Sequence, residues 1–298
     1  MKLTIIISTY NRAESLIRTL ESVAKQSADP STWECVVVNN ASTDNTAERF
    51  TSFASNHNNI NLRMVDEQKQ GLSHARNKGI SVAKGQFVAF IDDDETISEN
   101  FVEAYISIFD GGYAFVAMGP VHPIYEVKRP KWMSKYTEQM IANPIYLGDK
   151  PYTISSKITP AGGNMAFSKE LFTFYNGFDT DLGRNGKELT GGEETELFRR
   201  IRSLGERVFY VPKAVVYHHI GADKLTPEYF DKLSYGVGCS KRIQAEKEDR
   251  LKELYADESR KRLYTNILSI FYILTLRPAK AKWLRRMRNG ISKGIFER

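Results

Sequence analysis

The first 110 residues alternate between apolar runs and stretches with helical spacing. The apolar runs, which are typical of strands buried on both faces of a sheet, lie at 3–8, 34–38, 60–66 and 86–91. Apolar residues recur at helical spacing at 13–26, at 44–55 and from Gly71 onward. Four rounds of strand and helix predict an α/β fold with a Rossmann-like, mostly parallel central sheet flanked by helices.

Beyond residue 110 this simple alternation stops. We expect a strand at 113–121, and then an irregular loop region at 122–160 that is rich in Pro, Tyr, Lys and Trp. A helix is expected from residue 191, and strand-like runs follow at 207–211 and 214–218. From about residue 226 the pattern is helical, which predicts a domain at 1–222 and a helical, basic C-terminal extension at 223–298.

Polar clusters follow the predicted strands, at residues 9–12, 39–44, 71–77 and 92–95. Ligands on such sheets bind outside the carboxyl ends of the strands. The last cluster holds four consecutive acids, which raise one another's pKa values. A divalent cation removes that cost, and carboxylates suit Mg²⁺ or Mn²⁺. The alternative is a solvated acidic turn that caps a helix beginning near Ser98, with Glu95 as the acid that opens this helix.

Several classes of protein are excluded or disfavoured by what the sequence lacks. It contains no P-loop motif, no Gly-x-Gly-x-x-Gly after the first strand and no Gly-x-Ser-x-Gly. Two distant cysteines, Cys35 and Cys239, make neither a disulfide framework nor a zinc site, which favours a reducing cytosol. The apolar run near the N-terminus is too short for the core of a signal peptide.

An ordered set of motifs over residues 3–219 resembles glycosyltransferase family 2, with its GT-A fold. The motifs are Ser8-Thr9-Tyr10-Asn11-Arg12, Asn39-Asn40-Ala41-Ser42, Gly71-Leu72-Ser73-His74-Ala75-Arg76-Asn77, Asp92-Asp93-Asp94, Gly162-Gly163-Asn164, Gly191-Gly192-Glu193-Glu194 and His218-His219. The resemblance implies an inverting hexosyltransferase that uses a nucleotide-diphosphate sugar, UDP-linked, and Mn²⁺ or Mg²⁺. It also implies a nucleotide-binding half at 1–110 and an acceptor and catalytic half at 111–222.

The resemblance assigns roles to individual residues. Thr9, Asn11 and Arg12 are expected along the nucleotide, with Asn40 and Arg76 near the base. Asp92 and Asp93 are expected on the donor side. Asp94 is the expected metal ligand, and His218, or alternatively His219, is expected near the metal or the pyrophosphate. A metal held there neutralises the charge that develops on the leaving pyrophosphate.

The acids at 193–194 bear on catalysis, and four residues that precede them bear on the nucleotide or the acceptor. The family usually has Glu-Asp where this chain has Glu193-Glu194, so Glu194 takes the position of the general base, with Glu193 beside it. The alternative is that both acids cap a helix. The resemblance also shows that Asn39 stands where many relatives carry Asp, which bears on which nucleobase is bound. Asn164 and Trp132 are candidate acceptor contacts. Trp132 and its neighbour Tyr136 could stack on an acceptor sugar, and the alternative is that they pack the loop onto the body of the protein.

The tail carries most of the basic character. Residues 260–298 hold 11 Lys and Arg and one acid, Glu297. The apolar portion at 263–276 is shorter than the roughly 20 residues that span a bilayer, and basic residues with Trp283 follow Pro278. This pattern is typical of an interfacial membrane anchor. The alternative is a helical pair packed on the body or on a second subunit. Nucleic acid is disfavoured because no binding fold is recognisable.

These features predict an enzyme of glycan or polysaccharide biosynthesis that acts at the cytoplasmic face of the membrane on a glycan or lipid-linked acceptor. Two alternatives compete with it. A sugar-phosphate nucleotidyltransferase usually has a Gly-rich loop after the first strand, and here that position holds Thr9-Tyr10-Asn11-Arg12. A non-catalytic nucleotide-sugar-binding scaffold is opposed by the intact acidic cluster. The sugar, the nucleotide, the linkage and the oligomeric state stay open.

Overall fold

The computed structural model describes residues 1–186 and 189–297, and the chain divides into two compact units. Unit 1 consists of Met1–His122, Ile145–Asp181 and Glu193–His219. Unit 2 consists of Pro123–Pro144, Leu182–Gly192 and Ile220–Arg298. The predicted domain limits at residues 110 and 222 stay predictions. Unit 2 includes two segments that precede residue 222, Pro123–Pro144 and Leu182–Gly192.

The core of unit 1 is an eight-stranded sheet with the strand order β3-β2-β1-β4-β9-β6-β10-β8. The strands are β1 Leu3–Thr9, β2 Trp33–Asn39, β3 Leu62–Asp66, β4 Phe87–Asp92, β6 Val116–Met118, β8 Tyr152–Thr153, β9 Met165–Ser168 and β10 Val208–Tyr210. β1 to β4 pair in parallel, whereas β9 runs antiparallel to β4 and β6. A smaller sheet has the order β5-β11-β7, from β5 Glu95–Ile97, β11 Val216–Ile220 and β7 Val121–Tyr125. The predicted mostly parallel sheet is confirmed.

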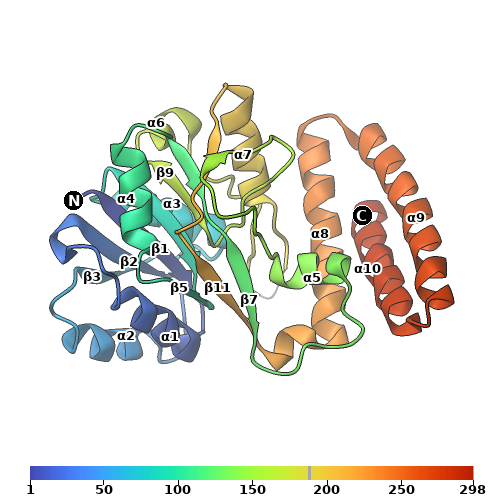
Figure 1. Cartoon of the computed structure of the whole chain (residues 1–298), viewed down its shortest axis with the longest axis horizontal. Helices are drawn as coiled ribbons and strands as arrows, with labels where there is room; N and C mark the ends of the chain where they lie inside the picture. Colours follow the sequence, from blue (N-terminus) through green and yellow to red (C-terminus); the bar gives the residue numbers. More distant parts are fainter. Residues whose placement is uncertain (187–188, 298) are drawn as a thin grey trace. The chain divides into compact units, whose positions relative to one another are not determined.

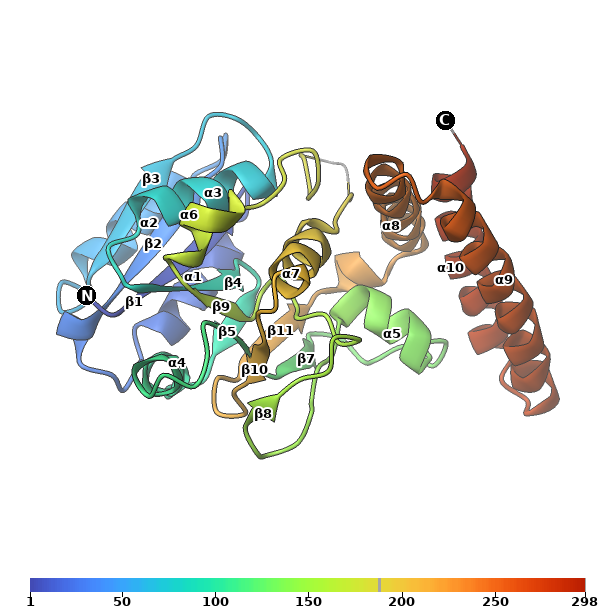
Figure 2. The same ribbon diagram turned by 90° about the horizontal axis from the view of Figure 1, so that it is seen from above.

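Helices cover both faces of the large sheet. Those of unit 1 are α1 Ala13–Val23, α2 Thr46–Ser55, α3 Leu72–Val82, α4 Phe101–Asp110, α6 Leu171–Tyr175 and α7 Glu193–Ser203, with a 3-10 turn at Pro30–Thr32. Figure 2 shows α3 and α6 on one side of the sheet and α4 on the other. α3 lies so close to β1 that a Cβ on Gly79 would stand 2.4 Å from Ile6 Cγ2. This close packing fixes the loop at the start of α3 above the sheet edge.

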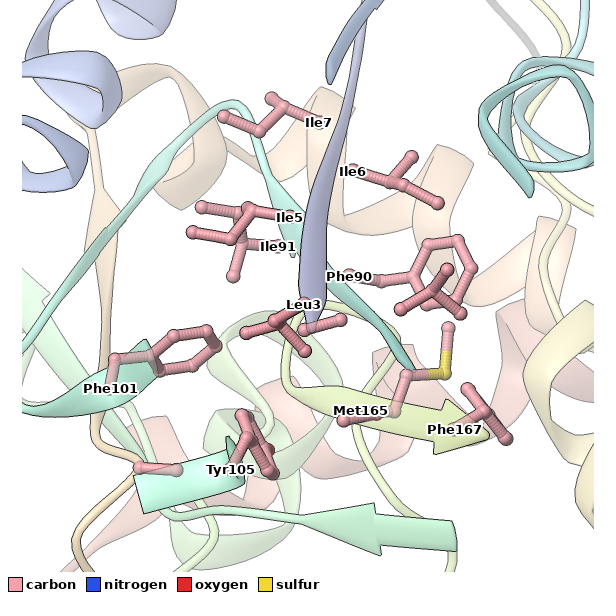
Figure 3. Close-up of a cluster of buried hydrophobic side chains, with 14 of the residues drawn as sticks. Leu3, Ile5, Ile6, Ile7, Phe90, Ile91, Phe101, Tyr105, Met165 and Phe167 are labelled. Atoms are coloured by element: carbon pink, nitrogen blue, oxygen red, sulfur yellow. The ribbon is translucent and has the colours of Figure 1, made fainter. Parts of the chain in front are cut away.

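The buried core follows the alternation of side chains along β1 and β4. Leu3, Ile5 and Ile7 point to the face that α4 covers with Phe101 and Tyr105, as Figure 3 shows. On the opposite face, Ile6 and its register partner Phe90 lie with Met165 and Phe167 of β9. Because both faces are covered, the strands read as continuous apolar runs rather than alternating ones. The core therefore holds the carboxyl ends of β1, β2 and β4 at fixed positions.

Unit 2 is helical. Its helices are α5 Lys135–Ala142, α8 Pro227–Lys247, α9 Leu251–Leu274 and α10 Pro278–Phe296, with a 3-10 turn at Ala222–Leu225. α10 packs against both α8 and α9 (Figure 1). A buried carboxylate, Glu258, joins α9 to α10 by accepting hydrogen bonds from Arg288 (2.8 Å) and Ser292 (2.5 Å). Among the described residues, no helix has the length and apolar content needed to cross a bilayer.

The region after residue 110 differs from the sequence prediction in three places. The single strand expected at 113–121 is two strands, β6 and β7, separated by Gly119 and Pro120. A proline has no N–H for a sheet ladder, and a Cβ on Gly119 would stand 2.0 Å from Ala214 O. The stretch 122–160 contains β7, α5 and β8, so it is more ordered than expected. The helix expected near Ser98 begins at Phe101, because β5 intervenes.

Candidate active site

The acidic turn after β4 lies beside the loop after β1. The parallel register pairs Ser8 with Asp92, so both loops leave the sheet at the same edge. Thr9 Oγ1 donates to Asp93 Oδ2 at 2.8 Å. Arg12 Nη1 lies 3.0 Å from Asp93 Oδ1 and 2.7 Å from Asp94 Oδ2. Arg12 therefore holds two adjacent, buried carboxylates.

Burial controls the protonation of this turn. It raises the pKa of Asp93 to about 6, although the charge of Arg12 opposes the shift and that of Asp94 adds to it. The charges of Asp93 and Asp94 in turn raise the pKa of Arg12 above its ordinary value, against its own burial. Much of the repulsion that the sequence analysis expected a cation to relieve is therefore relieved by an arginine of the chain.

Glu95 departs from its expected role. It was expected to be a solvated acid that opens a helix, but it lies in β5 and is buried. Its Oε2 accepts a hydrogen bond from Asp92 N at 2.9 Å, so the buried side chain stabilises the acidic turn. A Cβ on Gly163 would stand 2.0 Å from the same oxygen, so a side chain at this position would displace the carboxylate. The expectation was wrong because position 95 pairs with β11, through His218, rather than facing solvent.

A buried arginine of α3 links the acidic turn to the start of α7. Arg76 is 2% exposed, and its Nη1 donates to Glu193 Oε1 at 2.8 Å. Its Nη2 donates to Asp92 Oδ1 at 3.2 Å. The guanidinium carbon lies 5.3 Å from the ring centroid of Phe178. A Cβ on Gly162 would stand 2.7 Å from Nη2, so a glycine lets this segment approach the guanidinium.

Glu194 lies next to this ion pair, and its pKa is raised. Burial raises its pKa to about 8, the charge of Glu193 adds to the shift, and Arg76 opposes it. The Oε2 atoms of Glu193 and Glu194 are both buried, and neither has a hydrogen-bond partner in the described part of the chain. A buried, unpartnered carboxylate oxygen is costly unless another molecule supplies a donor. The role of Glu194 as a base stays a prediction.

The residues predicted to hold a metal lie near one another. His218 Nε2 is 3.7 Å from Asp94 Oδ1, whereas His219 Nε2 lies 3.0 Å from Thr96 Oγ1. Within residues 1–186 and 189–297, no three His, Cys, Asp or Glu side chains form a group able to hold a metal alone. Nucleotide sites commonly hold Mg²⁺ with one or two carboxylates and the phosphates of the substrate. One carboxylate and one imidazole fit this kind of binding.

The asparagines predicted to lie near the nucleotide organise the loops in this structure. Asn11, at a positive φ of 52°, accepts hydrogen bonds from Thr43 N (2.7 Å) and Asp44 N (3.2 Å). Asn40 donates to the carbonyls of Glu67 and Lys69 and accepts from Gly71 N at 2.8 Å. Their expected contacts with a nucleotide stay predictions, and the loops that would make them are held by these bonds.

The two candidate acceptor residues have structural contacts in their own units. In unit 1, Asn164 is fully buried and bonds to Tyr105, Pro120 and Ala214. In unit 2, the ring of Trp132 stacks on Trp283, with centroids 3.8 Å apart. Tyr136 bonds to Tyr264 through the two hydroxyl groups at 3.0 Å. These contacts are those expected for loop packing, and a role in acceptor binding stays a prediction.

The sequence analysis missed three residues that shape the site. Glu95 was taken for a surface acid, and the sequence analysis gave Phe178 no role. Asn77 holds Phe178 beneath Arg76, since its side chain bonds to both the N–H (2.8 Å) and the C=O (2.9 Å) of Phe178. The available signal was Gly177-Phe178-Asp179, where Gly177 has a φ of 66°. The conformation of that glycine fixes the aromatic ring that follows.

The predicted site residues form two joined networks in unit 1. Thr9, Arg12, Asp93, Asp94 and His218 make the first, and Arg76, Asp92, Glu193 and Glu194 make the second. Asp92 and Asp93, neighbours in the chain, join them. The arrangement places positive charge, paired carboxylates and one partly buried acid of raised pKa at the end of an α/β sheet.

Comparison with known proteins defines the class. The sequence model of the family described as "Glycosyl transferase family 2" matches residues 4–173. The chain therefore belongs to glycosyltransferase family 2 and is a nucleotide-sugar glycosyltransferase, as the motifs predicted. The glucosyl-dolichyl phosphate glucuronosyltransferase of Haloferax volcanii is 26% identical over 281 residues, 92% of this chain and 85% of that protein. Glycosyltransferase AglE of the same organism is 35% identical over 108 residues, 36% of this chain and 35% of AglE.

Solved structures agree on the fold. The mannosyltransferase PcManGT from Pyrobaculum calidifontis, in complex with GDP-Man and Mn²⁺, has a TM-score of 0.66 at 20% identity, covering 100% of this chain and 88% of that one. Staphylococcus aureus TarS in complex with UDP-GlcNAc has a TM-score of 0.59 at 19% identity, with 98% and 91% covered. The predicted GT-A fold, with its C-terminal helical region, is confirmed.

Proposed function

We propose that the protein transfers a hexose, with inversion, from a nucleotide-diphosphate sugar to an acceptor hydroxyl, and that Glu194 is the general base. The observation that carries this proposal is the unpartnered, buried Oε2 of Glu194 beside the Arg76–Glu193 ion pair. The same arginine reaches Asp92 on the donor side of the site. An acceptor hydroxyl would supply the missing hydrogen-bond donor to Glu194.

The residues divide the work of the transfer. As the acceptor oxygen bonds to the anomeric carbon, the bond from that carbon to the phosphate oxygen breaks, and the nucleoside diphosphate leaves with the electron pair. Glu194 takes the hydroxyl proton. Arg76 neutralises Glu193, so the neighbouring charge opposes ionisation of Glu194 less than it otherwise would. Asp94 and His218 would hold a divalent cation, which supplies charge neutralisation at the leaving diphosphate.

The finer identity of the substrates is also part of the proposal. We propose a UDP-sugar as donor and a glycan or lipid-linked acceptor, as in polysaccharide assembly at the cytoplasmic face of the membrane. The relative of 26% identity is named for a dolichyl phosphate acceptor, which supports a lipid-linked acceptor. Structural relatives were solved with UDP-GlcNAc and with GDP-Man and Mn²⁺. The identity of the nucleobase is therefore the less supported part of this proposal.

The proposal is tested by incubating the protein with a panel of nucleotide sugars, Mn²⁺ and lipid-linked acceptors. We expect acceptor-dependent release of nucleoside diphosphate. Because general base catalysis contributes about 10²–10⁴-fold, Glu194→Gln should lower the transfer rate by that factor and leave donor binding intact. Glu170→Gln, at an exposed position of unit 1, is the matched control and should transfer normally. Near-normal transfer by Glu194→Gln would remove it as the base.

The competing functions give different products. A nucleotidyltransferase would consume or release pyrophosphate instead of nucleoside diphosphate. A scaffold would bind the donor without turnover in every assay.

The metal site is tested by calorimetric titration of nucleoside diphosphate with and without Mn²⁺. In the wild type, Mn²⁺ should tighten binding, and its removal by a chelator should reverse the effect. Asp94→Asn keeps a hydrogen-bond acceptor for Arg12 but removes the charge, so the effect of Mn²⁺ should disappear. Asp110→Asn, at the surface of unit 1, should keep it. An unchanged response to Mn²⁺ in Asp94→Asn would place the metal elsewhere.

A further inference from the structure

One face of helix α9 exposes large apolar side chains, of which Tyr264 also contacts Tyr136. The exposed residues near its C-terminal end, here called the α9 stripe, are Leu263, Tyr264, Ile267, Ile270, Phe271, Ile273, Leu274 and Leu276. Leu274 is 76% exposed and Leu276 90% exposed. The opposite face of the helix is used for packing, since Thr265, Ser269 and Tyr272 are buried. The large apolar side chains of this part of α9 therefore lie mainly on its exposed side, and hydroxyl-bearing residues lie on the packed side.

The width of the stripe distinguishes it from a helix-pairing seam. At about 100° per residue, its members from Leu263 to Leu274 spread over roughly half of the helix circumference. A two-helix coiled coil needs only a narrow seam of two positions per heptad. A broad apolar face suits a broad, nearly flat apolar partner better than a single second helix.

The charge around the stripe has one sign. Residues 259–296 contain ten Lys and Arg and no Asp or Glu. Four of these cations are exposed and have no carboxylate within ion-pair distance in the described chain: Arg262, Arg277, Lys282 and Arg285. A parallel second copy placed on the stripe would bring these cations together. A surface that carries negative charge would neutralise them.

The turn that ends the stripe places Leu276 in an unfavourable backbone conformation. Leu276 has a φ of 56° and follows the C-cap of α9. Its N–H donates to Ile273 O and the N–H of Arg277 donates to Tyr272 O, which is the helix ending that normally uses a glycine at this position. A glycine would relieve the left-handed strain. The chain instead has a leucine whose side chain is almost fully exposed.

We propose that the α9 stripe and the cations beside it bind the surface of an anionic phospholipid bilayer. The apolar side chains would enter the boundary between headgroups and acyl chains, and the cations would lie against the lipid phosphates. No described helix crosses a bilayer, so the contact lies in the plane of the interface. This proposal does not depend on glycosyl transfer, because binding to lipid requires no donor or acceptor.

The test is flotation of the full-length protein with vesicles of phosphatidylcholine alone or with phosphatidylglycerol added. We expect binding only to the anionic vesicles, with loss at high salt. Ile267→Ser with Phe271→Ser should weaken partition by at least about tenfold. Lys282→Gln with Arg285→Gln should weaken it by about fivefold for each cation, equivalent to about 1 kcal/mol. Phe174→Ser is the matched control, since Phe174 is 71% exposed in α6 of unit 1, and it should bind normally.

Leu276→Gly separates lipid binding from folding. It removes an apolar side chain and the left-handed strain together, so partition should fall several-fold while the unfolding midpoint stays or rises. Loss of binding in this variant therefore does not come from unfolding. The proposal fails if the folded wild type ignores anionic vesicles, or if stripe variants and Phe174→Ser bind alike. It also fails if sedimentation velocity shows a dimer that the stripe variants dissociate, because the stripe would then be covered by a second copy.

Discussion

The two units treat charge and apolar surface in opposite ways. In unit 1, most charges of the site are buried and held in ion pairs, and the apolar side chains of the strands lie in the core. In unit 2, α9 exposes large apolar side chains. Four cations, Arg262, Arg277, Lys282 and Arg285, lie at the surface without carboxylate partners in the described chain. The first arrangement is expected at a site preorganised for charged substrates. The second is expected at a surface that binds a membrane or another protein.

This difference also separates what each unit loses on mutation. Removing one member of a buried pair leaves an uncompensated charge, which is strongly destabilising. Removing an exposed apolar or basic side chain costs folding little, and the effect falls on binding. Stability measurements should therefore respond to unit 1, and partition measurements to the α9 stripe.

The largest expected effect on folding comes from Arg76→Ala. The substitution leaves Glu193 buried without its partner, and we expect a loss of about 3–5 kcal/mol in the free energy of unfolding. Unfolding in urea measures it. The exposed Arg49–Glu14 pair of the same unit offers the control, and Arg49→Ala should cost no more than about 1 kcal/mol. Equal losses in the two variants would mean that the pair at Glu193 is not buried in solution.

The second effect is the opposite pH dependence of activity and stability that Glu194 should produce. The pKa of this residue in the folded protein is about 8, above its ordinary value of 4.5, so the folded state binds the proton more tightly. Its contribution to stability is full below pH 4.5 and is lost as pH rises to 8, by at most about 1.4 kcal/mol per pH unit. Transfer needs the ionised form, so its rate should rise about tenfold per pH unit below pH 8.

Glu194→Gln provides the check, since it should remove this part of the pH dependence of unfolding. A wild-type rate that stays flat between pH 6 and 8 would contradict the assignment. Denaturant unfolding and initial rates over the same pH range distinguish the two effects, because one falls where the other rises.

The sequence predicted the first half of the fold well because the strands there are buried on both faces. Continuous apolar runs such as 3–8 and 34–38 leave little room for another interpretation, and β1 and β2 begin and end within a residue of these limits. Prediction weakened after residue 110, where β6 and β8 have only three and two residues. Such short strands have no periodicity of their own, and their pairing comes from contacts that are distant in the sequence.

The candidate site was predictable by location but not by contact. The acids at 92–94 and the base candidate at 194 were named because polar residues follow buried strands and because ordered motifs support one another. The Arg76 bridge and the burial of Glu95 were not predictable, since Arg76 bonds to Glu193 and Glu95 pairs with His218 of β11, both of which are distant in the sequence. A glycine pair at 162–163 gave the only local hint, because its lack of side chains makes room for both groups.

The smallest expected effect tests whether the exposed Leu276 at the end of α9 lowers the free energy of unfolding. Leu276→Gly should raise the free energy of unfolding by about 1 kcal/mol, because a residue other than glycine at a positive φ costs about 1–2 kcal/mol. Leu276→Ala removes the same apolar side chain but keeps a Cβ at that φ, so stability should stay near that of the wild type. Both variants should lose the same partition onto anionic vesicles. If the glycine variant alone loses binding, the turn conformation matters more than the side chain, and Leu276 does not belong to the binding surface.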